Sequence, residues 1–297
     1  MYIAENNEET LSFAGEKRHS RLKDFWRRYR KNKLAVFALL LIAVIVIVVV
    51  FANQIAPFDY AKQDLSNTFQ YPNWQHLLGT DNFGRDLLSR LIYGGRISLL
   101  VSLLALVIAI IPGILLGATA GFIGGAYEGV VMRVMDILMA IPGFLLAVSI
   151  SAMLGSGIFN TAIAIAVSGL PSYVRLMRGQ VLTLKDQEFV EAATALGNSK
   201  MRILAKHIIP NTLSPIIVDS TLKIGGFILT ISGLSFVGLG VQPPTPEWGS
   251  ILAAGREYIR DFWPIVTFPG IAIMITMFGF NVMGDGLRDA LDPRLKQ

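Results

Sequence analysis

The chain has 297 residues, of which 53% are hydrophobic and only 16% are charged, and its mean hydropathy is +0.55. A soluble domain carries about 25% charged residues. Here the apolar residues are gathered into long runs, so the composition indicates an integral membrane protein. The absence of cysteine excludes disulfides, thiolate nucleophiles and thiolate metal sites. The net charge of +5 does not indicate nucleic-acid binding, because much of the basic character lies in residues 17–33, beside the first apolar run.

Residues 1–33 are predicted to form a cytoplasmic segment that contains an amphipathic helix. Within 20–33, apolar side chains recur at helical spacing among basic residues. They are Leu22, Phe25, Trp26 and Tyr29. This pattern is typical of a helix that lies on the inner leaflet in contact with lipid. An anchor before the first membrane span is the simpler hypothesis, and a regulatory element is the alternative.

Six apolar runs follow, each long enough to supply most or all of the roughly 20 residues with which a helix crosses a bilayer. We predict spans over residues 34–52, 97–117, 129–152, 158–178, 212–237 and 262–284. The chain is therefore expected to be an all-α, polytopic membrane protein. Its six-span domain would cover 34–284, and a short tail would cover 285–297.

The orientation of these spans follows from their basic flanks. Lysine and arginine are abundant in 1–33, at 175–206 and in the tail, and basic residues near spans favour the cytoplasmic side. Six spans place all three segments on that side. Both termini are thus predicted to be cytoplasmic, with loops 53–96 and 238–261 facing outward.

The polar connection 179–211 is long for a loop between membrane helices, and long loops are usually functional or disordered. It is rich in helix formers, and Gly197 is suited to end a helix with positive φ. Asn198 and Ser199 can cap a second short helix, which Pro210 is expected to stop or kink. The segment is predicted to be a helix–glycine–helix hairpin, which serves either as a docking element or as a merely structural loop.

No catalytic motif is present. The chain lacks the sequence patterns of a phosphate-binding loop, a zinc protease and a serine hydrolase. Its three histidines, His19, His76 and His207, are far apart. We therefore expect neither nucleotide hydrolysis nor a metal site on this chain.

Charged residues inside or near spans cost roughly 2.5–3.5 kcal/mol each at a helix centre. Asp219 and Lys223 lie at i and i+4 of the fifth span, and Arg133 and Asp136 lie at i and i+3 of the third. Both sets are predicted to be local ion pairs that lower this cost. The alternative is that they are a polar lining of a translocation path.

The outer loops carry two further expectations. Residues 84–96 are predicted to form a surface helix before the second span, with Asp86 and Arg90 paired at i and i+4. Trp248, which follows a proline-rich stretch, is expected at the membrane interface.

Four motifs together resemble a known family. Glu191-Ala192-Ala193, then Gly197, then Ile209-Pro210 resemble the EAA loop of bacterial ABC-importer permeases, although His207 and Ile209 replace its usual isoleucine and leucine. Three further segments resemble the dipeptide/oligopeptide/nickel permeases, and most of all their second, C-type subunit. They are GTDNFGRDLLSRLIYGGRISLL (79–100), LSFVGLGVQPPTPEWG (234–249) and NVMGDGLRDALDPRLK (281–296).

The resemblance implies a type I ABC-importer permease in the bacterial plasma membrane. It implies a second homologous permease, two cytoplasmic ATPase subunits that carry ATP and magnesium, and an extracytoplasmic binding protein as partners. Glu191, Ala192, Ala193, Gly197, Ile209 and Pro210 would couple transport to an ATPase. Di- or oligopeptides are the expected substrates; nickel or another small solute stays open, and no substrate-binding residue is assigned. A self-sufficient secondary transporter or channel and a membrane scaffold are the competing hypotheses.

Overall fold

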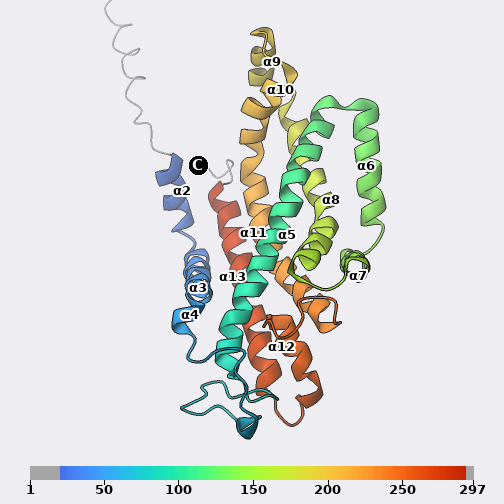
Figure 1. The fold of residues 1–297 in the computed structure, drawn as a ribbon. Helices are drawn as coiled ribbons and strands as arrows, with labels where there is room; N and C mark the ends of the chain where they lie inside the picture. The colour runs from blue at the N-terminus through green and yellow to red at the C-terminus, as the bar shows by residue number, and fades with distance from the viewer. Residues whose placement is uncertain (1–20, 292–297) are drawn as a thin grey trace, which may run out of the picture.

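The structure, a computed structural model, describes residues 21–291, which form α-helices joined by loops (Figure 1). In chain order the helices are α2 (Arg21–Tyr29), α3 (Lys33–Val50), α4 (Ala52–Ile55), the 3₁₀ turn η2 (Leu65–Asn67), α5 (Leu87–Ile123), α6 (Gly125–Met139), α7 (Gly143–Leu154), α8 (Ile158–Leu184), α9 (Glu188–Ala195), α10 (Lys200–Ile203), the π-helix η3 (Leu204–Ile208), α11 (Ile209–Phe236), α12 (Trp248–Gly255), the 3₁₀ turn η4 (Arg256–Tyr258) and α13 (Pro264–Leu291). The predicted all-α class is confirmed.

Four helices of the described part are long and apolar enough to cross a membrane: α3, α5, the continuous helix 200–236, and α13. The bent pair of α6 and α7 makes a fifth if it is counted as one span. The fourth predicted span, 158–178, lies within α8, which has 27 residues and packs along α5 but does not meet the same test of length and apolarity. The count of six spans therefore stays a prediction.

The third predicted span is not one straight helix. α6 and α7 meet at a bend of 89°, close to Pro142. Proline lacks a backbone N–H and disfavours helical geometry in the residue before it, so Ile141-Pro142-Gly143 breaks the helix that the apolar run predicts. Residues 129–152 therefore lie on two helices with a sharp bend between them, and the bend was not predicted.

Other boundaries also shift. Residues 87–96 are the first turns of the 37-residue α5, so the predicted separate surface helix does not exist. α8 runs on to Leu184, and α10, η3 and α11 form one continuous helix. The non-helical parts of the polar connection are therefore only 185–187 and 196–199.

Helices α5 and α8 make the most extensive pairing among the described helices, and glycines let the two helices approach closely. Gly113, Gly117 and Gly121 recur every fourth residue on the face of α5 that meets α8. A Cβ at Gly117 would lie 2.5 Å from the carbonyl oxygen of Val174. Such spacing of small residues lets membrane helices approach backbone to backbone.

Helix α2 confirms the helix predicted in 20–33. It packs against the end of α13: Tyr29 is 2% exposed, belongs to a buried cluster with Ala290, and donates a hydrogen bond of 3.0 Å to the carbonyl of Ala35. Trp26, by contrast, is 41% exposed. Figure 1 shows α2 and the end of α13 in the half of the molecule that carries α9, opposite the loop that precedes α5.

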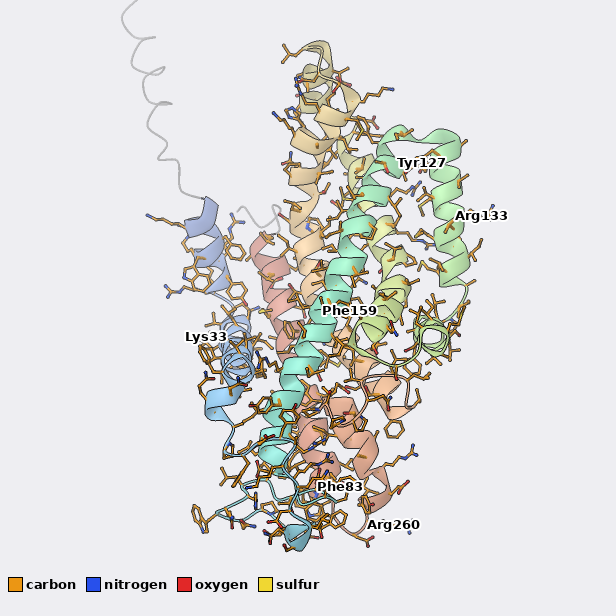
Figure 2. All side chains as sticks on the ribbon, in the orientation of Figure 1. Lys33, Phe83, Tyr127, Arg133, Phe159 and Arg260 are labelled. Atoms are coloured by element: carbon orange, nitrogen blue, oxygen red, sulfur yellow. The ribbon has the colours of Figure 1, made fainter. Side chains whose placement is uncertain are left out.

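That loop, residues 56–86, folds as a cap around buried charges, and Phe83 and Arg260 mark this end in Figure 2. Asp81 accepts a hydrogen bond of 2.7 Å from Nε of Arg85, and its carboxylate lies 3.4 Å from Nε of Arg90. Asp86 caps the first turn of α5 and lies 2.9 Å from Nδ1 of His76. The predicted pair of Asp86 with Arg90 was wrong, because Asp86 serves as the helix cap while Arg90 reaches Asp81.

The start of α12 is also anchored in the interior. Glu247 is fully buried, caps α12 and accepts a hydrogen bond of 2.8 Å from Ser98 of α5. Trp248 is 3% exposed and donates through Nε1 to the carbonyl of Leu91 at 2.8 Å. The expectation that Trp248 lies at the membrane interface was wrong, because its indole packs in the core.

Candidate functional site

Helix α9 stands at the far tip of the molecule from the cap (Figure 1) and ends in a glycine motif. Gly197 has φ of +76°, its N–H donates to the carbonyl of Thr194 at 2.9 Å, and the N–H of Asn198 donates to Ala193 at 3.2 Å. These two bonds form a Schellman motif, which satisfies carbonyls that a helix end leaves without partners. The predicted glycine-ended helix is confirmed.

The second half of the hairpin differs from the prediction. The side chain of Asn198 bonds back to Ala193, and Ser199 precedes α10 without a side-chain cap. Pro210 does not stop the helix. It lies in the first turn of α11, one residue after the π-helix η3, and the helix continues through it.

The signature residues of the hairpin divide between its surface and its packing. Glu191 and Ala192 are exposed, whereas Ala193 is 4% exposed and packs into a cluster with Met177 of α8 and Ile203 of α10. Ile209 and Pro210 follow at the start of α11, Ile209 against the same cluster and Pro210 exposed. Only Glu191 and Ala192 of the EAA triplet are therefore free to contact another molecule.

The tip also exposes two apolar side chains that were not predicted from the sequence. Leu196 is 83% exposed and Met201 is 62% exposed, on either side of the glycine turn. A hollow of about 440 Å³ lies along α9, lined by Lys185, Glu191 and Thr194 among others. The sequence does hold one sign of this exposure. Leu196 directly precedes Gly197 at the turn of the hairpin, where neither helix is expected to cover its side chain.

The predicted pair in α11 is present. Nζ of Lys223 lies 3.7 Å from Oδ2 of Asp219, and the ammonium also sits over the ring of Tyr173 of α8, 5.2 Å from its centroid. The two charged side chains are partly exposed, 23% for Lys223 and 34% for Asp219. The i, i+4 spacing thus brings the two charged side chains together, as predicted. Tyr173 of α8 is a further neighbour of Lys223, which the spacing along one helix could not indicate.

The predicted pair of Arg133 with Asp136 is absent. Asp136 instead contacts Arg175 of α8 at 2.6 Å, and Glu128 contacts Arg178 at 2.5 Å. Arg133 is exposed on the side of α6 away from α8 (Figure 2). The prediction was wrong because the carboxylate faces the neighbouring helix, where a guanidinium offers a closer partner.

The histidine and carboxylate side chains are potential metal ligands, so we compared their positions in the fold. Within residues 21–291, no three His, Asp or Glu side chains are grouped so that they could hold a metal ion. His76 lies in the cap and His207 near the opposite tip, in η3. His19 falls outside the described residues.

Family models match two parts of the chain. Residues 113–297 match the "Binding-protein-dependent transport system inner membrane component", and residues 20–72 match the "N-terminal TM domain of oligopeptide transport permease C". After residue 19 the two matches leave only 73–112 uncovered, which is the second part of the cap and most of α5.

Similar curated proteins match over nearly the full length. The di/tripeptide transport system permease protein DppC of Pseudomonas aeruginosa is 47% identical, with 93% of each chain covered. The glutathione transport system permease protein GsiD of Escherichia coli O6:K15:H31 is 44% identical, over 92% of this chain and 90% of the relative.

Solved structures share the fold at lower identity. Two inward-facing structures of the MetNI methionine ABC transporter match with TM-scores of 0.56 and 0.57 at 16% identity. The match covers 69% of this chain and 98% of each matched chain. This likeness concerns the arrangement of helices.

Proposed function

The chain belongs to the binding-protein-dependent transport system inner membrane components and has the type I ABC-importer permease fold, and from this premise we propose that it imports di- and oligopeptides. Relatives that are 44–47% identical are named as permeases for di/tripeptides and for glutathione, which is itself a small peptide. Nickel or another small solute is the second candidate, on the family resemblance alone.

In this proposal the chain is one of two homologous permeases and performs no catalysis. Two cytoplasmic ATPases bind ATP and magnesium and supply the work, and an outer binding protein delivers the peptide. The side that bears α9 is then cytoplasmic, together with α2 and the end of α13, and the cap formed by 56–86 faces outward. α2 lies on the inner leaflet of a bacterial plasma membrane.

The proposal that this chain couples transport to an ATPase rests on the side chains exposed at the tip formed by α9 and α10. A rigid, glycine-ended helix presents Glu191 and Ala192 beside exposed Leu196 and Met201. Isolated large apolar side chains are common on surfaces. Here two of them flank a stiff turn, and a hollow lies along the same helix, so the tip as a whole is suited to dock in a groove on a partner. Ala192 lets the partner approach the helix backbone closely.

The test is the variant Glu191→Lys in the complete importer. Glu191 is exposed at the tip, so the change should leave insertion and stability unaltered. We expect weaker co-purification of the ATPases and loss of peptide uptake. Glu257→Lys is the matched control: it makes the same charge reversal at an exposed site of η4, at the opposite end of the molecule.

Wild-type uptake by the Glu191→Lys importer, with ATPases still bound, would contradict the proposed docking. Uptake by the chain alone, without ATP or partners, would favour a secondary transporter. A scaffold would bind the ATPases without any effect of peptide on ATP hydrolysis.

A further inference from the structure

One face of α11 carries small and polar side chains along most of its length. Asp219, Lys223, Gly226, Thr230 and Gly233 follow one another at intervals of four, three, four and three residues, which places them on a single face. We call this face the α11 stripe. The other sides of α11 pack against α5, α8, α12 and α13. Within residues 21–291, no atom outside the helix lies within 4 Å of the position of a Cβ on Gly226, so the middle of the stripe is open.

The charged end of the stripe is incompletely satisfied. The Asp219–Lys223 separation of 3.7 Å is too long for a direct hydrogen bond. Oδ2 of Asp219 is buried and has no hydrogen-bond partner in the described part of the chain. Buried polar atoms are nearly always bonded, and an exception at a partly exposed ion pair indicates capacity for another ligand.

The other end of the stripe opens into a cavity of about 770 Å³. Thr230 and Gly233 of the stripe form one wall, Phe144 of α7 lies beside them, and Met274 and Met277 of α13 lie opposite. A mostly apolar hollow of this volume is in the range of small-ligand pockets. Methionine side chains adapt to differently shaped apolar groups. The stripe therefore joins a pair of opposite charges to an adaptable apolar hollow.

A free dipeptide presents the complementary chemistry at neutral pH: an ammonium, a carboxylate, and side chains that are often apolar. Its extended length is at most about 7 Å. Side chains at i and i+4 have Cβ atoms about 5–6 Å apart. One peptide can thus reach both charges of the pair with its two ends.

From this arrangement we infer that the α11 stripe is this chain's wall of the translocation path, with Asp219 and Lys223 receiving the ammonium and carboxylate ends of a passing peptide. The cavity receives peptide side chains. The pair separates to bind peptide and closes again after it leaves, so the site is transient. The inference rests on the peptide substrate of the proposed function and adds the residues that recognise it.

The test uses the importer reconstituted in proteoliposomes with its second permease, both ATPases and binding protein, and radiolabelled dialanine as the probe. Asp219→Asn combined with Lys223→Met removes both charges at similar size. We expect uptake to fall at least tenfold while the loaded binding protein still stimulates ATP hydrolysis. Asp136→Asn with Arg175→Met neutralises the ion pair between α6 and α8 and should keep uptake within twofold of wild type.

Two further variants separate a path from a structural pair. Asp219→Lys with Lys223→Asp retains an ion pair but exchanges the charges, and we expect at least a fivefold loss. Gly226→Phe obstructs the open middle of the stripe and leaves both charged residues in place, and we expect uptake to be blocked in an assembled complex.

Wild-type uptake by the exchanged pair or by Gly226→Phe would overturn the inference. If the neutral double variant does not assemble, Gly226→Phe alone decides. Failure of the wild-type importer to take up dialanine or other peptides would instead refute the proposed function, and the inference with it.

Discussion

The close contact of α5 with α8 leads to a sharp prediction about Gly117. In Gly117→Ala the added Cβ would lie 2.5 Å from the carbonyl oxygen of Val174 and 2.8 Å from Cβ of Met177. These are a backbone atom and the first atom of a side chain, so neither can move without shifting α8. Overpacking of this kind costs typically about 1–3 kcal/mol.

A matched glycine removes the effect of helix propensity. Replacing glycine by alanine inside a helix stabilises it by about 0.8–1.0 kcal/mol. Gly129 lies inside α6, and no atom in the described part of the chain lies within 4 Å of its Cβ position, so Gly129→Ala should show this gain alone. The two variants should therefore differ by the packing cost.

The assay is thermal unfolding of the purified chain in detergent, followed by tryptophan fluorescence. A change of 1 kcal/mol shifts Tm by roughly 2–4 °C in large domains. Gly117→Ala should thus melt at least about 2 °C below Gly129→Ala on that scale. Equal melting temperatures would show that α5 and α8 do not rely on this approach, and the close packing argued from the glycines would fail.

Two further predictions concern the ends of the molecule. Gly197→Ala places an L side chain at φ of +76°, which costs roughly 1–2 kcal/mol, so hydrogen exchange of α9 should rise about 5- to 30-fold; unchanged exchange would contradict the Schellman geometry. Glu247→Ala leaves Ser98 without its buried acceptor and should destabilise the chain by about 1–3 kcal/mol, whereas Glu247→Gln keeps an acceptor and should lower Tm less; equal losses in both variants would argue against the hydrogen bond.

Much of the fold follows from local patterns in the sequence. Long apolar runs predict helices because a bilayer leaves backbone groups no other partners. Gly197 was predictable because the left-handed region beyond a helix end favours glycine. Pro142 also signals a helix break, but the residues on both sides of it are apolar, and their apolarity alone predicts one continuous span.

The remaining features depend on packing between distant segments. Asp136 has a basic neighbour three residues before it, yet it pairs with Arg175 because α8 lies against α6. Trp248 is buried because α12 folds back onto α5 and bonds to Leu91. Residue spacing defines faces of a helix, but it does not say which face meets which neighbour. For the same reason the stripe on α11 was visible in the sequence only as one ion pair.

The position of the stripe gives the proposed coupling a short mechanical route. Val190 and Ala193 tie α9 to the ends of both α8 and the helix 200–236 through one buried cluster, so the tip cannot move independently of them. From Pro210 to Asp219 the helix rises about 14 Å, at 1.5 Å per residue. A push on α9 therefore reaches the charged pair along one unbroken helix. That route includes the π-helix η3 and Pro215 inside α11, and π-bulges are frequent at functional sites.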